Sequence, residues 1–343
     1  MPFVFHHEDE VAIPVFTFDG GKGVAKTATY IPFPGRGAPV GVAHPDSSKV
    51  VFSYDREVLR ILNGMFPEWK PYVEVIDAVA LRQISDAAML HWDNETHEYI
   101  KAALNRHLGP WQTEEPMTNP DGTPLRKADG TIATRVVNMP QLPRPHYVIH
   151  DGLDILSEIE EMRMRFHQKL KPFQGFAERS YWKQRRLGLR ELLELSIRVA
   201  TDGVIFVTYV EQKDIYKDGA VVETREVPKW LDLIEKRTDV WLRCLRFDDL
   251  PKKKSVFQVV VKSSKLLGFP QGQVFDVTGK VDPSTGRVDM KGKTFVEQVN
   301  PIAWAPEIVR QEVTPPPELH PVPEGTTVKT EEETQAELDA LGL

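Results

Sequence analysis

The sequence has only one cysteine and no long apolar segment. Cys244 stands alone among 343 residues, so neither an internal disulfide nor a cysteine-based zinc site is expected, and a reducing, cytoplasmic setting is favoured. The longest apolar run, Val204 to Val210, is far shorter than the roughly 18 to 20 residues that cross a bilayer. The first ten residues lack a basic segment followed by an apolar one. We therefore expect no membrane span and no secretory signal.

The sequence also lacks an excess of positive charge. Lys and Arg number 43 against 50 Asp and Glu, and the net charge is −7. Seven acids and one lysine follow residue 312, so the rest of the chain is nearly neutral. This balance argues against a protein that coats nucleic acid with its whole surface. A local basic loop, or a basic channel shared between subunits, stays compatible with it.

Prolines, 27 in all, mark the boundaries of segments. The run TPPPELHPVP at 314–323 predicts an extended linker. The acidic residues after it predict a disordered tail, which is either simply solvated or binds a protein partner. We therefore expect one domain over residues 1–312 and a linker with a tail over 313–343. Within the domain, the PDG and ADG turn signals of residues 111–145 predict a hairpin insertion.

Short segments rich in Val, Ile, Phe and Tyr alternate with segments of helical spacing. The predicted strands are Val11–Phe18, Lys49–Tyr54, Tyr72–Ile76, Tyr147–Ile149 and Gly203–Val210, with helices predicted at Glu95–Leu108, Ile155–Phe166 and Leu189–Val199. This alternation predicts an α/β fold with a mostly parallel central sheet and helices on both faces. After Val210 the pattern changes to paired strands, which predict an antiparallel C-terminal extension.

A glycine-rich segment follows the first predicted strand. Its nine residues are Gly20, Gly21, Lys22, Gly23, Val24, Ala25, Lys26, Thr27 and Ala28. Glycine amides that wrap a phosphate chain, a lysine for the β and γ oxygens and a hydroxyl for Mg²⁺ are the parts of a P-loop. We therefore predict that this segment binds ATP and that Lys26 acts on the transferred phosphate. Ala25 stands where the G-x-x-x-x-G-K-[ST] pattern has glycine, and an ordinary glycine turn is the alternative.

A short apolar strand that ends in an acid lies at Tyr147–Asp151. A P-loop requires a second acidic strand end for Mg²⁺, so we predict that Asp151 and Thr27 are the metal ligands. The segment resembles a Walker B element, although His150 is less apolar than the residue usual before the aspartate. An N-cap of the following helix is the alternative role of Asp151.

The order of these motifs resembles the RecA-like P-loop ATPases, and within them the compact recombination ATPases encoded by many phages. The resemblance covers roughly residues 11–279. It implies that Glu57, in the D-x-E that follows the strand at 50–54, polarises the attacking water. It implies that Gln212, after the strand that begins near Val207, senses the γ-phosphate. It further implies that Lys262 and Lys265 act in trans on a neighbour's ATP, although two residues rather than one separate them.

Each of these implied roles has a structural alternative. Glu57 is also a suitable first residue for a helix, where an acid is favoured by the helix dipole. Gln212 is equally an ordinary polar residue at a strand end, and the two lysines are equally a solvated strand end. The spread of all these motifs over alternating strands, in the family's order, favours the functional interpretation.

The resemblance implies a Mg²⁺-dependent ATPase that acts on single-stranded DNA in recombination or replication. It also implies a homo-oligomer, and the host cytoplasm if the source is viral. The DNA-binding candidates are the segment Lys213–Lys229 and the aromatic-basic cluster Arg179–Arg186; the alternative for the cluster is a helix start with solvated arginines. A second hypothesis is a nucleotide-binding interaction module without effective hydrolysis. The histidines and acids of His6–Glu10 have no second cluster to close a metal site.

Overall fold

In the computed structural model, the described residues are arranged around one large β-sheet. The chain divides into Met1–Arg310 and Gln311–Leu343, and all described residues lie in the first unit. They are residues 13–304 except 55–56, 79–85, 120–122, 128, 172–173, 176–178, 218–219, 230–233, 235, 250–253, 283 and 286–287. The predicted strand residues Val11 and Ala12, the segment His6–Glu10 and the acidic tail therefore lie outside the described residues.

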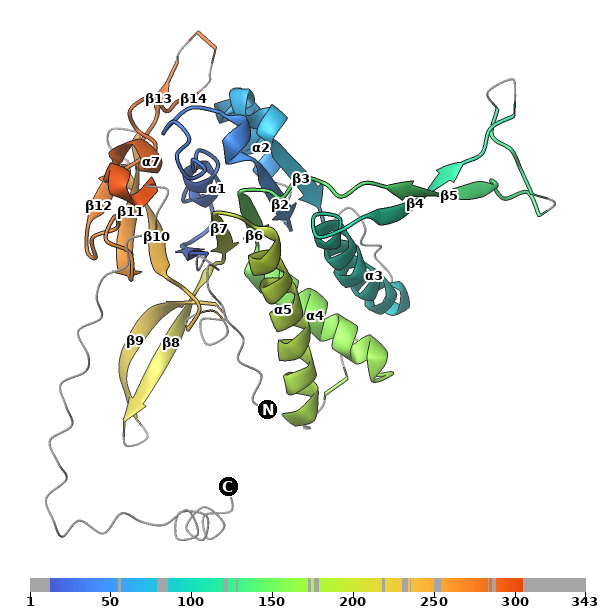
Figure 1. Ribbon diagram of the computed structural model, residues 1–343. Coiled ribbons are helices and arrows are strands. Elements are labelled where there is room, and N and C mark those ends of the chain that lie inside the picture. Colours follow the sequence, from blue (N-terminus) through green and yellow to red (C-terminus); the bar gives the residue numbers. More distant parts are fainter. Residues whose placement is uncertain are drawn as a thin grey trace, which may run out of the picture. The chain divides into compact units, whose positions relative to one another are not determined.

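An eight-stranded sheet forms the centre of this unit, in the order β12-β11-β10-β1-β7-β6-β2-β3 (Figure 1). Its six parallel strands are β1 (Val15–Asp19), β2 (Lys49–Ser53), β3 (Val73–Asp77), β6 (Tyr147–Asp151), β7 (Gly203–Val207) and β10 (Val240–Asp249). β11 (Lys254–Ser264) and β12 (Val274–Asp276) continue the sheet with antiparallel pairing. The predicted parallel sheet with an antiparallel C-terminal extension is confirmed.

Helices cover both faces of the sheet, as predicted. One face carries α1 (Lys26–Tyr30), α2 (Glu57–Met65) and α7 (Phe295–Gln298), and the other carries α3 (Asp86–Asn105), α4 (Leu153–His167) and α5 (Arg179–Val199) (Figure 1). Three 3-10 helices lie in the connections, at Pro45–Ser47, Pro67–Tyr72 and Pro301–Trp304.

Alternate residues of each parallel strand enter opposite cores, because successive side chains of a strand point to opposite faces. In β7, Ile205 and Val207 pack with α1 and α2, whereas Val204 and Phe206 pack with the longer helices. Both sets are fully buried, which explains why this strand is continuously apolar in the sequence.

Among the described residues, three two-stranded hairpins pair only within themselves. They are β4 (Trp111–Pro116) with β5 (Thr134–Met139), β8 (Val210–Lys217) with β9 (Ala220–Pro228), and β13 (Lys280–Val281) with β14 (Val288–Asp289). The strand expected over Gly203–Val210 ends at Val207, since Thr208 and Tyr209 leave the sheet before β8 begins. Among the described residues, no helix has the length and apolar character needed to traverse a bilayer.

Candidate functional site

The glycine-rich loop, Gly20–Ala25, turns tightly between the carboxyl end of β1 and α1. Gly20 has φ 146° and Gly23 has φ 71°, values that residues with a side chain rarely adopt. A Cβ atom at Gly20 would lie 2.4 Å from the carbonyl oxygen of Cys244 in β10. The loop therefore requires glycine at its start because it lies directly against the backbone of the neighbouring strand.

Ala25 adopts a left-handed conformation, with φ 64° and ψ 24°. This conformation costs a residue with a Cβ roughly 1 to 2 kcal/mol relative to the ordinary helical region. The sequence pattern has glycine at this position, and the backbone explains why. The fold therefore tolerates the alanine at the cost of local strain, which is a common feature of functional sites.

Lys26 is folded back onto the glycine-rich loop. Its Nζ donates hydrogen bonds of 3.0 Å and 2.8 Å to the carbonyl oxygens of Gly20 and Gly21. The same Nζ lies 4.1 Å from the centre of the Tyr209 ring, a cation–π contact. Burial lowers the pKa of Lys26, and the charge of Asp151 is among those that oppose this shift.

The side chains of Thr27 and Asp151 meet at the head of the loop. The Thr27 hydroxyl donates a 2.9 Å hydrogen bond to Oδ2 of Asp151, and the Tyr30 hydroxyl donates a second one of 2.7 Å to the same oxygen. Asp151 closes β6, two strands away from β1 in the sheet. Parallel strands bring their carboxyl ends to one edge, so residues 124 positions apart come into contact.

A cavity of about 1000 Å³ opens beside this contact. Residues 22–27 of the glycine-rich segment, Glu57 and Asp151 line it. Its other walls come from the start of β11, from β12 and from the β13–β14 hairpin, with apolar side chains such as Phe257. A pocket that is mostly apolar with a few converging polar groups is the usual form of a small-molecule site.

Glu57 is the first residue of α2. Its Oε2 accepts a 2.9 Å hydrogen bond from Nη2 of Arg60, and both residues line the cavity. Asp55 and Arg56 of the predicted D-x-E lie outside the described residues. Glu57 therefore begins a helix, which agrees with the structural role. It also lines the cavity, which a catalytic role requires.

The other three predicted catalytic residues do not line the cavity. Gln212 is exposed in β8, opposite Glu226 of β9, because the polypeptide leaves the sheet at Thr208 rather than at Gln212. Lys262 lies near the end of β11 that is remote from the cavity, and Lys265 pairs with Asp239 at 3.7 Å. A role of these lysines toward their own chain's loop is therefore excluded, and a role in trans stays a prediction.

The sequence did not predict Tyr30 or Tyr209 as part of the site. Tyr30 shares Asp151 with Thr27, and Thr208 and Tyr209 line the cavity. Thr208 interrupts the apolar run directly after Val207, and this break in the sequence indicates where the strand ends and the site begins.

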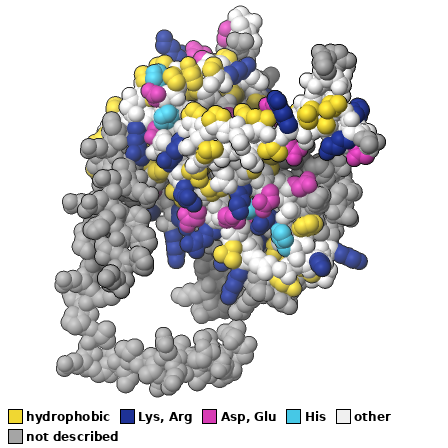
Figure 2. All heavy atoms as spheres, turned by 45° about the vertical axis from the view of Figure 1, so that its right-hand side comes forward, with side chains coloured by type: hydrophobic (Ala, Val, Ile, Leu, Met, Phe, Trp, Pro, Cys, Tyr) yellow, Lys and Arg dark blue, Asp and Glu magenta, His cyan; other side chains and the backbone are white. Residues whose placement is uncertain are grey.

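The two DNA-binding candidates fall on different elements. Residues 213–229 form most of the β8–β9 hairpin, where the side chains of Lys213, Tyr216 and Arg225 are outside the described ones. The cluster at 179–186 begins α5, and Arg185 is buried in a 3.0 Å ion pair with Glu161. The cluster is a helix start, as the alternative predicted, but Arg185 is buried rather than solvated and is therefore a structural residue. On the face in Figure 2, basic and acidic side chains of the coloured, described residues are interspersed.

His150, next to Asp151, is a neutral core residue. Its ring stacks on Phe52 at 5.1 Å, and its nitrogens contact the Tyr54 hydroxyl at 3.0 Å and the Ser196 hydroxyl at 2.8 Å. Burial lowers its pKa to about 3. The histidine therefore replaces the usual apolar residue without bringing a charge into the sheet.

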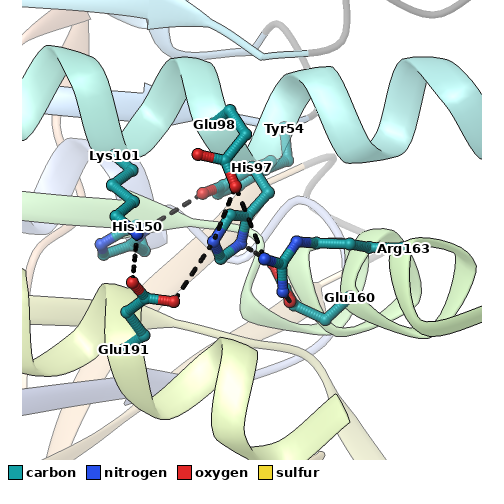
Figure 3. Close-up of polar contacts among 8 residues, drawn as sticks. All are labelled: Tyr54, His97, Glu98, Lys101, His150, Glu160, Arg163 and Glu191. Atoms are coloured by element: carbon teal, nitrogen blue, oxygen red, sulfur yellow. Dashed lines mark hydrogen bonds and ion pairs between the residues drawn. The ribbon is translucent and has the colours of Figure 1, made fainter. Parts of the chain in front are cut away.

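A separate polar cluster lies between α3, α4 and α5 (Figure 3). Its members are His97, Glu98, Lys101, Glu160, Arg163 and Glu191. His97 is fully buried, with Nδ1 bonded to Glu160 and Nε2 3.6 Å from Glu191. The two carboxylates lie at opposite ring nitrogens, and none of the described residues forms a group of three or more His, Cys, Asp or Glu suited to a metal. The cluster joins three helices outside the cavity.

Comparison with known proteins adds little to this geometry. No protein-family model matches the chain, and no curated protein matches it. Among solved structures the chain is similar to the KaiC-like protein PH0186 from the hyperthermophilic archaeon Pyrococcus horikoshii OT3, with 10% sequence identity and a TM-score of 0.36. The similarity covers 81% of this chain and 96% of that chain. A TM-score at this level carries no argument, so the fold class rests on the strand order and the site on its own contacts.

Proposed function

We propose that the chain binds ATP with Mg²⁺ in the cavity and hydrolyses it. The hydrogen bond between Thr27 and Asp151, at the head of the glycine-rich loop, carries this proposal. A hydroxyl and a carboxylate in contact beside a lysine and a strained glycine turn are the donor set of a P-loop. The strand order supports a RecA-like arrangement, because β7 separates the loop strand from the strand that bears the acid.

Lys26 and the loop amides hold the phosphates in this proposal. Lys26 leaves the carbonyl oxygens of Gly20 and Gly21 and turns its charge toward the β and γ oxygens. Its burial keeps water away from the contact, which strengthens the attraction to a phosphate. Mg²⁺ supplies charge compensation at the phosphates when it is bound, and Thr27 and Asp151 are the residues that hold it.

Glu57 is the residue that orients the attacking water. It lines the cavity from the start of α2, and a carboxylate at this position accepts a proton or a hydrogen bond from water. We also propose that Lys262 or Lys265 of a neighbouring subunit balances the negative charge of the phosphates. Such an arrangement makes turnover dependent on assembly.

Single-stranded DNA is the proposed partner, and the β8–β9 hairpin is its proposed contact. The hairpin begins directly after Tyr209, and the Tyr209 ring contacts Lys26 of the proposed nucleotide site. Recombination or replication is the proposed process. A phage origin stays a prediction that no observation on the site addresses.

Calorimetric titration with ATP, with and without Mg²⁺, tests the binding step. We expect Lys26→Ala to abolish binding, whereas Lys70→Ala, which removes an exposed lysine of the Pro67–Tyr72 helix, leaves binding unchanged. Equal binding by the two variants contradicts the proposal.

Hydrolysis with and without single-stranded DNA tests the reaction. We expect DNA to stimulate turnover. Binding of ATP without turnover at any DNA or protein concentration supports instead the non-hydrolysing interaction module, which the strained Ala25 favours.

A further inference from the structure

The β8–β9 hairpin is attached to the sheet at Tyr209. Tyr209 lies directly before β8, and its carbonyl oxygen accepts a 2.9 Å hydrogen bond from the amide of Lys229, directly after β9. The start of β8 and the end of β9 are therefore joined at Tyr209. Since the hairpin pairs only within itself, a movement of Tyr209 reaches both of its strands.

Tyr209 also contacts the one lysine that a triphosphate must recruit. The Lys26 Nζ lies 4.1 Å from the centre of its ring and donates to the carbonyl oxygens of Gly20 and Gly21. An ammonium group that turns toward a phosphate leaves these carbonyls and this ring. The ring then loses its contact with the ammonium group. Because Tyr209 joins the two ends of the hairpin, nucleotide binding changes the contacts at the base of the hairpin.

Arg243 makes a second, independent link between the hairpin and the loop. Its Nε and Nη2 donate to the carboxylate of Asp19 at 3.0 Å and 2.7 Å, a bidentate pair with a fully buried acid. Its Nη1 lies 3.3 Å from the Glu226 carboxylate, and Nη2 donates to the Glu226 carbonyl oxygen at 3.2 Å. The hydrogen bonds that Arg243 donates to Asp19 raise the pKa of Arg243, so the guanidinium stays charged.

The two partners of Arg243 belong to the two parts that the link joins, the β1 end that leads into the loop and the hairpin. Asp19 directly precedes Gly20, the residue packed against the Cys244 carbonyl, and Glu226 belongs to β9. One guanidinium thus holds both Asp19, the last residue of β1 before the glycine-rich loop, and the second strand of the hairpin. A bidentate arginine pair of this kind is rigid. A shift of the glycine-rich loop therefore moves Arg243 and, through it, the Glu226 end of the hairpin.

We propose that Tyr209 and Arg243 are positioning residues that couple the glycine-rich loop to the β8–β9 hairpin, so that a nucleoside triphosphate in the cavity changes the conformation of the hairpin. This inference rests on the proposed binding of ATP. By linkage, a partner that binds the hairpin changes the affinity for nucleotide by the same factor.

Hydrogen exchange of the hairpin amides, with and without Mg²⁺ and a non-hydrolysable ATP analogue, tests this coupling. Calorimetry on the same samples measures binding of the analogue. We expect bound analogue to change exchange in Val210–Pro228 of the parent by roughly fivefold or more. Each variant is compared at an analogue concentration that calorimetry shows to be saturating for it. Under that condition we expect the response of the hairpin to be lost in Tyr209→Leu and kept in Tyr209→Phe, which retains the ring.

The second link is tested at its exposed end, because removal of Arg243 leaves a buried carboxylate unpaired and endangers folding. Glu226→Gln keeps the Asp19 pair and weakens the outer contact, and we expect it to reduce the response at least twofold. Glu211→Gln, a change at an exposed residue of β8, is the matched control and keeps the full response.

The outcomes separate the two proposals. If the parent binds no analogue, the proposed function fails and the inference fails with it. If the analogue binds and hairpin exchange is unchanged in the parent, the inference alone is overturned. Equal responses of Tyr209→Leu and Tyr209→Phe also overturn it, because they show that the ring transmits nothing.

Discussion

The Thr27 hydroxyl donates a 2.9 Å hydrogen bond to Asp151, a residue 124 positions away. The bond joins the loop after β1 to the end of β6, and β7 lies between these strands. Its chemistry, a hydroxyl beside a carboxylate at the head of a glycine-rich loop, is the feature on which the proposed Mg²⁺ site depends. The first prediction therefore concerns this pair.

Asp151→Asn is expected to make ATP binding independent of Mg²⁺. The amide still accepts a hydrogen bond from Thr27 or Tyr30, so the fold is kept, but it lacks the charge that holds the cation. Titration with ATP at several Mg²⁺ concentrations measures the effect. Thr27→Ser, which keeps the hydroxyl, is the control and retains the Mg²⁺ dependence. A Mg²⁺ response of Asp151→Asn equal to that of the parent refutes the assignment.

Ala25→Gly is expected to stabilise the protein by about 1 kcal/mol, because glycine adopts φ 64° without strain. Ala28 provides the matched control, since it lies in α1, where glycine costs about 1 kcal/mol. Urea unfolding of the parent and the two variants measures both changes. Opposite signs are expected, and a loss of stability in both variants contradicts the interpretation of Ala25 as strained.

Glu57→Gln is expected to bind ATP as the parent does and to lose turnover by about 100-fold or more, because the amide cannot accept a proton from water. Steady-state hydrolysis and calorimetric binding, measured on the same preparation, separate the two effects. Glu74→Gln, a change at an exposed residue of β3, serves as the control. Undiminished turnover in Glu57→Gln assigns the residue to the helix start alone.

The parts of the site that are contiguous in the sequence were predictable. The glycine-rich loop and the strand that ends in Asp151 each carry their pattern within a few residues, and the alternation of strands and helices indicated that both reach one edge of a parallel sheet. Ala25 was recognisable as a departure from the pattern, and the backbone angle now supplies the reason.

Contacts that depend on strand order were not predictable. Tyr209 reaches Lys26 because β7 is the neighbour of β1, and Arg243 reaches Asp19 because β10 is its other neighbour. Neither adjacency is encoded in a local pattern. The resemblance placed Gln212 at the polar end of the strand that contains Val207, but that strand ends at Val207 and Gln212 lies in β8.

His150 is expected to make stability depend on pH. Its pKa is about 3 in the folded protein and near 6.5 when unfolded, so below pH 6.5 the unfolded chain binds a proton that the folded one does not. Stability is therefore fully present above pH 6.5 and falls as the pH drops toward 3, by about 2 kcal/mol at pH 5. Urea unfolding at pH 7.5 and pH 5 measures this loss.

His150→Gln isolates the contribution of this one histidine. Glutamine keeps hydrogen-bonding groups near Tyr54 and Ser196 but does not titrate, so the variant is expected to lose about 2 kcal/mol less than the parent between the two pH values. An identical pH dependence in parent and variant shows that other groups cause it.

Glu160→Ala is expected to destabilise the protein by about 3 kcal/mol or more, because it leaves buried His97 and the nearby Arg163 without their shared carboxylate. The exposed pair of Arg135 and Glu115, 3.2 Å apart on the β4–β5 hairpin, is the matched control. There, Glu115→Ala is expected to cost less than about 1 kcal/mol, since water screens the pair. Urea unfolding at pH 7.5 measures both. Because Glu160 does not line the cavity, ATP affinity of the folded variant stays at the parental value, and a large change in affinity would show that the helix cluster and the site are coupled.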